Sequence, residues 1–93
     1  MKNVEAVIRA LSDQTVRLDL ATRWANGYKV QRSLIGIVHA SRDTFSVEES
    51  FPGGEIVVMA RYNSVRSVRV DSDPGGFVGV ISIDTTIEED LDE

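Results

Sequence analysis

Apolar residues follow two different periods along this chain. Between Val4 and Leu11 they recur with the spacing of one helix face, which predicts a short amphipathic helix. Beyond this segment, Val16, Leu18 and Leu20 alternate with polar residues, as in a strand that buries one of its faces. The pattern therefore predicts a single helix followed by a chain that is mainly β.

Turn-forming residues divide the rest of the chain into short strands. Asn26-Gly27 is a strong hairpin-turn pair, and Pro52-Gly53-Gly54 interrupts the chain again. The alternation shifts near Gly36, which predicts a bend or a bulge in a long strand. We expect five strands and a sixth, beginning near Val16, Tyr28, Phe45, Glu55, Val65 and Phe77.

The expected fourth strand points to self-association. A small antiparallel sheet of five strands must curl to bury its inner face, and the resulting barrel-like, half-open shell leaves an edge exposed. The fourth strand carries no charge between Glu55 and Arg61, and it precedes the very short connection Asn63-Ser64. An apolar edge without charges favours pairing with another chain, and repeated head-to-tail pairing closes a ring when the rotation permits.

Composition fits one globular domain. The chain has 93 residues, of which 42% are apolar and 27% charged, and its apolar runs are far too short to span a membrane. Six of the 15 acidic residues lie in 84–93, so residues 1–83 hold nine acids against ten Lys and Arg. We expect a domain over 1–83 (core about 4–70, extra strand about 77–83), an acidic solvated tail over 84–93 and a cytoplasmic location.

Residues suited to catalysis or metal binding are sparse. The chain has no cysteine and one histidine, His39, so it offers neither a thiolate site nor a histidine pair. Glu48 and Glu49 are neighbours on an expected strand and therefore point to opposite faces. The glycine pairs do not follow the strand-to-helix pattern of a phosphate-binding loop. We therefore expect no enzymatic activity, no cofactor and no metal site.

Two short sequence motifs occur one after the other along the chain. The first runs Asn-Gly-Tyr-Lys-Val-Gln over 26–31, and the second runs Ala-Arg-Tyr-Asn-Ser-Val over 60–65. The first is similar to the Asn-Gly-Ile-Lys-Leu-Gln of Hfq, and the second keeps the Arg, one Asn and the Val of the Sm motif Ile-Arg-Gly-Asn-Asn-Val. Over about residues 4–70 the chain thus resembles the Sm-like family, including its Hfq branch. The Tyr-Lys-His of Hfq has no counterpart, and Arg32 stands where the first Sm motif usually has glycine.

This resemblance implies a helix that caps a strongly bent, five-stranded antiparallel sheet, an SH3-like barrel, with an extra C-terminal strand or extension. Strand four of one Sm-like subunit pairs with strand five of the next, and RNA runs around the pore of the ring. The implied RNA-binding residues lie in two loops: Arg61, Tyr62, Asn63, His39, Ser41 and Arg42. Arginine stacks on bases and reaches phosphates, tyrosine stacks, and asparagine reads base edges.

Two functions remain open from the sequence. One is a homo-oligomeric ring that binds single-stranded RNA rich in U or A; the alternative is a ring-shaped structural or protein-interaction module that does not bind RNA. Plainer roles also exist for three residues: packing against a neighbour for Tyr62, turn formation for Asn63 and an interface ion pair for Arg61. Trp24, beside the hairpin turn, is either packed or exposed for stacking.

Overall fold

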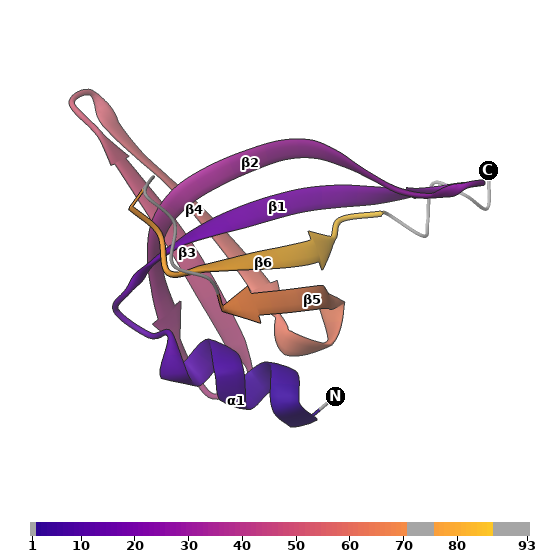
Figure 1. The fold of residues 1–93 in the computed structure, drawn as a ribbon. Helices are drawn as coiled ribbons and strands as arrows, with labels where there is room; N and C mark the ends of the chain where they lie inside the picture. Colours follow the sequence, from indigo (N-terminus) through magenta and orange to yellow (C-terminus); the bar gives the residue numbers. More distant parts are fainter. Residues whose placement is uncertain (1, 71–75, 87–93) are drawn as a thin grey trace.

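The computed structural model describes residues 2–70 and 76–86, which form one helix and one six-stranded sheet (Figure 1). The elements are α1 (Lys2–Ala10), β1 (Thr15–Trp24), β2 (Gly27–Ala40), β3 (Thr44–Phe51), β4 (Gly54–Arg61), the 3-10 turn η1 (Tyr62–Ser64), β5 (Val65–Val70) and β6 (Gly79–Asp84). The predicted mainly β class, its leading helix and the extra strand near 77–83 are confirmed. The acidic tail from residue 87 onward, and residues 71–75, lie outside the described part.

The strands form one mixed sheet in the order β4-β3-β2-β1-β6-β5. All neighbours are antiparallel except β1 and β6, which run parallel with Leu18 opposite Ile81. The sequence analysis expected five antiparallel strands and made no prediction about the pairing of the extra strand, which is parallel to β1. The extra strand lies inside the sheet, between β1 and β5. Every residue of β6 from Gly79 to Ile83 is buried.

The sheet curls but does not close. Within the described residues β4 pairs only with β3 and β5 only with β6, so each outer strand has an unpaired edge. Figure 1 shows β2 arching over the molecule towards α1. At Gly36, which faces the interior, an ideal Cβ would lie 2.2 Å from the carbonyl oxygen of Glu48 on β3. The missing side chain therefore lets β3 come close to β2 at the predicted bend.

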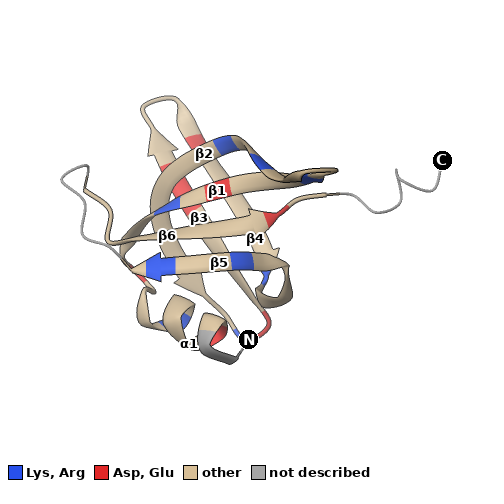
Figure 2. Cartoon of the chain, turned by 45° about the vertical axis from the view of Figure 1, so that its right-hand side comes forward, with Lys and Arg blue, Asp and Glu red and all other residues tan. Residues whose placement is uncertain are grey.

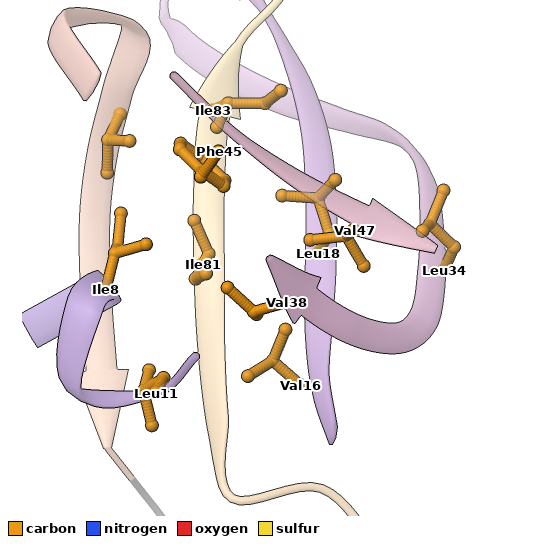
Figure 3. Close-up of a cluster of buried hydrophobic side chains, with 11 residues drawn as sticks. Ile8, Leu11, Val16, Leu18, Leu34, Val38, Phe45, Val47, Ile81 and Ile83 are labelled. Carbon is orange, nitrogen blue, oxygen red and sulfur yellow. The ribbon is translucent and has the colours of Figure 1, made fainter. Parts of the chain in front are cut away.

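The inner face of the curled sheet and one face of α1 enclose the hydrophobic core (Figure 3). Ile8 of α1 and Leu11, the residue directly after this helix, are both buried, as the apolar spacing from Val4 to Leu11 predicts. The sheet supplies the other members, Val16, Leu18, Leu34, Val38, Phe45, Val47, Val65, Ile81 and Ile83. Full burial of one such side chain contributes roughly 1.5–3 kcal/mol, so this cluster is the main source of stability.

The only helix longer than one turn in the described ranges is α1, which has nine residues. No helix of that part of the chain has the length and apolar character needed to cross a bilayer.

Replacing Gly36 with alanine should destabilise the fold, because the new methyl group overlaps the backbone of Glu48. Overpacked cores lose about 1–3 kcal/mol, and we expect a loss at the upper end because backbone atoms have little freedom to move. Urea unfolding measures this loss. Gly53→Ala is the matched control, since a Cβ there meets no atom within 4 Å. Equal unfolding midpoints for the two variants would contradict the role assigned to Gly36.

Candidate functional site

Four of the six predicted site residues meet where β3 begins and β4 ends. The backbone N–H of Ser41 donates to the carbonyl of Thr44 at 2.8 Å, which closes the loop between β2 and β3. Thr44 is opposite Arg61 in the β3–β4 pairing, so this loop lies beside the end of β4. Tyr62 directly follows Arg61, and its hydroxyl donates to the carbonyl of Ser41 at 2.8 Å. The structure thus brings Ser41, Arg42, Arg61 and Tyr62 together.

Tyr62 is engaged in packing within its own chain. Its half-buried ring lies 5.5 Å from the ring of Phe45, centroid to centroid, at an interplanar angle of 33°. The guanidinium of Arg9 lies 5.3 Å from the centre of the Tyr62 ring. Together with the hydrogen bond to Ser41, these contacts fix η1 against the loop and the core. Within this chain, therefore, Tyr62 connects η1 to the loop between β2 and β3 and to the core.

Arg9 ties the helix to this cluster, and the sequence analysis did not include it. Its side chain donates to Glu5 at 3.0 Å and to the carbonyl of Arg42 at 2.8 Å. The hydrogen bond with Glu5 is the main cause of a raised Arg9 pKa, so the guanidinium is charged at neutral pH. The spacing of Glu5 and Arg9 signals their ion pair in the sequence, but the contact with the distant loop has no sequence signal.

Two cations of the cluster face solvent. The side chains of Arg42 and Arg61 are exposed, and neither makes a hydrogen bond or an ion pair with another residue of the described ranges. Both chain segments are held in place by backbone bonds and by Tyr62, so the two guanidinium groups extend from an ordered base. A pair of exposed arginines on a fixed loop and strand end can bind phosphate oxygens.

His39 lies away from this cluster. It is opposite Ser46 on the outer, solvent-facing side of β2 and β3, whereas Phe45 and Tyr62 face the core. Its Nδ1 is 3.8 Å from a carboxylate oxygen of Asp13, and its Nε2 is 3.5 Å from one of Glu48. Alternation along a strand explains the separation, because residues one position apart face opposite sides of a sheet.

Asn63 lies in an open hollow of about 360 Å³, at the junction of η1, β5, β6 and the start of β2. The residues that line it, which we call the Asp84 hollow, are Tyr28, Asn63, Ser64, Val65, Arg66 and Asp84. Tyr28, Arg66 and Asp84 were not among the predicted site residues. These residues come from β2, β5 and β6. Asp84 lies near Tyr28 and Arg66 because β6 is placed next to β5 in the sheet, and the alternation of residues in the sequence does not predict this placement.

The side chains of this hollow hold one another in place. The Arg66 guanidinium stacks on Tyr28, 3.7 Å from the ring centre, and donates to the Ser82 hydroxyl at 3.2 Å. The Tyr28 hydroxyl donates to Asp84 at 3.0 Å. Burial pushes the Asp84 pKa upward, but hydrogen bonds from Thr86 and Tyr28 and the charge of Arg23 bring that pKa below its usual value. Asp84 is therefore ionised at neutral pH.

A second basic surface lies on the extended hairpin of β1 and β2, residues 21–33, which we call the arm. It carries Arg23, Lys29 and Arg32 and no acidic residue. Trp24 on this arm is 58% exposed, and the Lys29 ammonium lies 5.9 Å from its ring centre. The packed position that the sequence left open for Trp24 is therefore not adopted in the single chain.

Opposite charges mark the two ends of the sheet. The neighbouring carboxyl group of Glu48 on β3, through hydrogen bonding and like charge, raises the pKa of Glu55 on β4. At the other end, β5 carries Arg66 and Arg69, visible as its two blue segments in Figure 2. The outer strand β4 is thus mainly apolar, with Glu55 near its start and Arg61 at its end, and the outer strand β5 is basic.

Among the described residues, no group of three or more His, Asp or Glu side chains is arranged to hold a metal ion. Comparisons with protein-family models, with curated proteins and with solved structures gave no match for this chain. The functional assignment therefore depends on the geometry described above.

Proposed function

We propose that this chain is a subunit of an Sm-like ring that assembles head to tail through β4 and β5 and binds single-stranded RNA rich in U or A around the pore. One observation carries the proposal: the two outer strands of the sheet both have unpaired edges, and η1 joins them directly. A helix followed by a bent sheet, with only a short turn between β4 and β5, supports the Sm-like assignment. In this proposal β6 is an addition to the five Sm-like strands.

The exposed side chains of β4 and β5 favour a protein partner. Val57 and Met59 on β4 are 52% and 69% exposed, and Val70 on β5 is 65% exposed. On the other face of β4, Ile56 and Val58 are only partly buried against the core. A strand that covered the β4 edge would complete the burial of these side chains and satisfy its free backbone groups.

Charge favours β5 of a second copy as that strand. Hydrogen bonding and like charge from Glu48 raise the pKa of Glu55, so the two carboxylates disfavour each other's ionised form. β5 carries Arg66 and Arg69 and no acidic residue, so the charge along this strand has the opposite sign. Because the two surfaces differ and lie on the same molecule, the contact is heterologous, and repetition gives a closed ring or an open filament. Ring closure is the Sm-like outcome.

The RNA part of the proposal depends on Arg42 and Arg61. Both guanidinium groups are exposed next to η1 and therefore lie close to the proposed subunit contact. Phosphate contacts supply most of the affinity for single strands, and the near balance of charges in residues 1–83 implies a modest affinity for each subunit. Closure of a ring multiplies such a modest site through effective concentration.

The alternative is a ring that binds proteins and not RNA. The contacts of Tyr62 with Phe45, Arg9 and Ser41 favour it, because they use the ring that base stacking would require. Under this alternative, affinity purification recovers protein partners without RNA.

Lysines on the β4 edge should prevent assembly. In the double variant Val57→Lys/Met59→Lys both changes lie at exposed positions, so the subunit stays folded while its edge becomes charged. We expect several subunits per particle for the wild type and a monomer for the variant, by size exclusion with light scattering. The control is Ile35→Lys/Ile37→Lys, which changes exposed residues of the inner strand β2. A wild type that is strictly monomeric at tens of micromolar refutes the ring.

Arg61→Ala should weaken RNA binding roughly tenfold, the usual scale for losing one well-placed arginine. The measurement is fluorescence anisotropy with labelled oligo-U and oligo-A at two salt concentrations, and affinity should fall as salt rises. Arg32→Ala on the arm removes the same charge away from η1 and should change affinity less. If Arg61→Ala and Arg32→Ala reduce RNA affinity equally, the RNA-binding surface is not centred on η1. If neither oligonucleotide binds at micromolar protein in low salt, the RNA proposal fails.

A further inference from the structure

We infer that the tip of the arm, the β1–β2 hairpin of residues 21–33, enters the headgroup region of an anionic lipid bilayer. The arm is separate from the arginine cluster at the end of β4 and from the outer edges of the sheet. The inference therefore goes beyond the proposed function and does not depend on it. A contact of this kind needs exposed apolar side chains flanked by cations, and it needs no membrane-spanning segment.

The arm extends from the sheet as a ribbon of two strands. The pairing of β6 with β1 ends at Ala21, opposite Asp84, and the pairing of β3 with β2 reaches only Ile37. Between these limits β1 and β2 pair only with each other among the described strands. Figure 1 shows the ribbon extending past the end of β6, away from α1, and no residue of 21–33 belongs to the core cluster. Because a ribbon of two strands has little stability of its own in water, a surface that covers its tip stabilises it.

Apolar side chains are exposed on both faces of this ribbon. Trp24 lies on one face together with Thr22, whose hydroxyl accepts a hydrogen bond from the indole N–H at 2.9 Å. Tyr28 and Val30 lie on the other face, since Tyr28 is opposite Arg23, the neighbour of Trp24 on β1. A nucleic acid strand stacks its bases on one face of a ribbon, whereas the headgroup region of a bilayer surrounds an inserted tip on both faces. This distribution therefore favours a lipid surface.

The indole of Trp24 is suited to the interface between water and lipid. Tryptophan is enriched at this depth of a membrane, where its ring is buried and its N–H stays hydrogen-bonded. Here Thr22 already accepts that hydrogen bond, so burial of the ring leaves no polar group of the indole unpaired. The ammonium of Lys29 lies 5.9 Å from the ring centre, which places a cation at the level of the headgroup phosphates.

The charge of the arm favours anionic over neutral lipids. Arg23, Lys29 and Arg32 lie within residues 21–33, which contain no acidic residue (Figure 2). The charge of Arg23 helps to lower the pKa of Asp84, so part of it is offset, and Lys29 and Arg32 supply most of the attraction. Each Lys or Arg near an anionic surface strengthens attachment about fivefold, and salt screens this attraction.

The test uses the intrinsic fluorescence of Trp24, which is the only tryptophan of the chain. The full chain, with the acidic residues between 84 and 93 included, is mixed with vesicles of phosphatidylcholine alone or of phosphatidylcholine and phosphatidylserine in equal parts. With the anionic vesicles the emission should shift to shorter wavelength, because the indole leaves water, and the protein should sediment with the vesicles. Neutral vesicles should give weak effects, and high salt should release the protein from anionic ones.

Matched variants separate the role of charge from that of the indole. Lys29→Gln/Arg32→Gln should reduce binding to anionic vesicles about 25-fold, or about fivefold for each charge. Arg42→Gln/Arg61→Gln removes the same charge from the cluster beside η1, and it should lower RNA affinity while vesicle binding stays unchanged. Trp24→Ala, followed by sedimentation, should weaken vesicle binding without changing its salt dependence, because the cations remain.

The outcomes separate lipid from nucleic acid and this inference from the proposed function. If neither kind of vesicle binds, or if the protein sediments with vesicles without a change in Trp24 emission, the inference fails, and RNA binding is decided by its own test. Binding that is equal for neutral and anionic vesicles overturns the role of the arm's charge. If oligo-U or oligo-A quenches Trp24, and Lys29→Gln/Arg32→Gln loses RNA affinity as strongly as vesicle affinity, the arm is a nucleic-acid surface and the lipid assignment is wrong.

Discussion

Unpaired backbone groups at the two outer strands are the constraint on which the rest of this structure depends. The sheet curls far enough to bury Leu18, Phe45 and Ile81 against α1, yet β4 and β5 do not pair with each other. Each edge therefore presents a row of N–H and C=O groups, and on β4 this row borders exposed Val57 and Met59. Such an edge is covered by another chain or protected by charges, and β4 lacks protecting charges along most of its length. This arrangement supports the proposed self-assembly more directly than any other feature of the structure does.

The parallel strand β6 shapes both candidate surfaces. By lying between β1 and β5 it moves β5 one strand outward, so the basic edge with Arg66 and Arg69 stands at the end of the sheet. The same strand brings Asp84 beside Tyr28, which creates the hollow next to η1. The arginine cluster of Arg42 and Arg61 depends instead on η1 and on the short loop that Tyr62 holds. The chain thus places two chemically different surfaces on either side of one turn.

The positions of the helix and the strands along the chain could be predicted from the sequence better than the pairing between strands. Alternation and turn residues located every strand, and the short connection at Asn63-Ser64 corresponds to η1. Alternation does not encode which strands pair, so the parallel position of β6 was missed. In the site, the contact of Ser41 with Tyr62 agreed with the expected grouping, whereas His39 faces the other side because of its parity on β2. No pattern in the sequence indicated that Tyr28, Arg66 and Asp84 lie together, because their proximity results from the order of the strands in the sheet.

Hydrogen–deuterium exchange, resolved by residue, tests the coverage of the sheet edges most directly. Half of the amides in β4 point away from β3, and no other strand of the described residues pairs with them. If copies dock through these edges, the outward-pointing amides of β4 and β5 exchange as slowly as those in the middle of β1, which has neighbours on both sides. If they exchange as fast as the amides of the Pro52-Gly53 turn at high protein concentration, no strand covers the edges and the ring does not form.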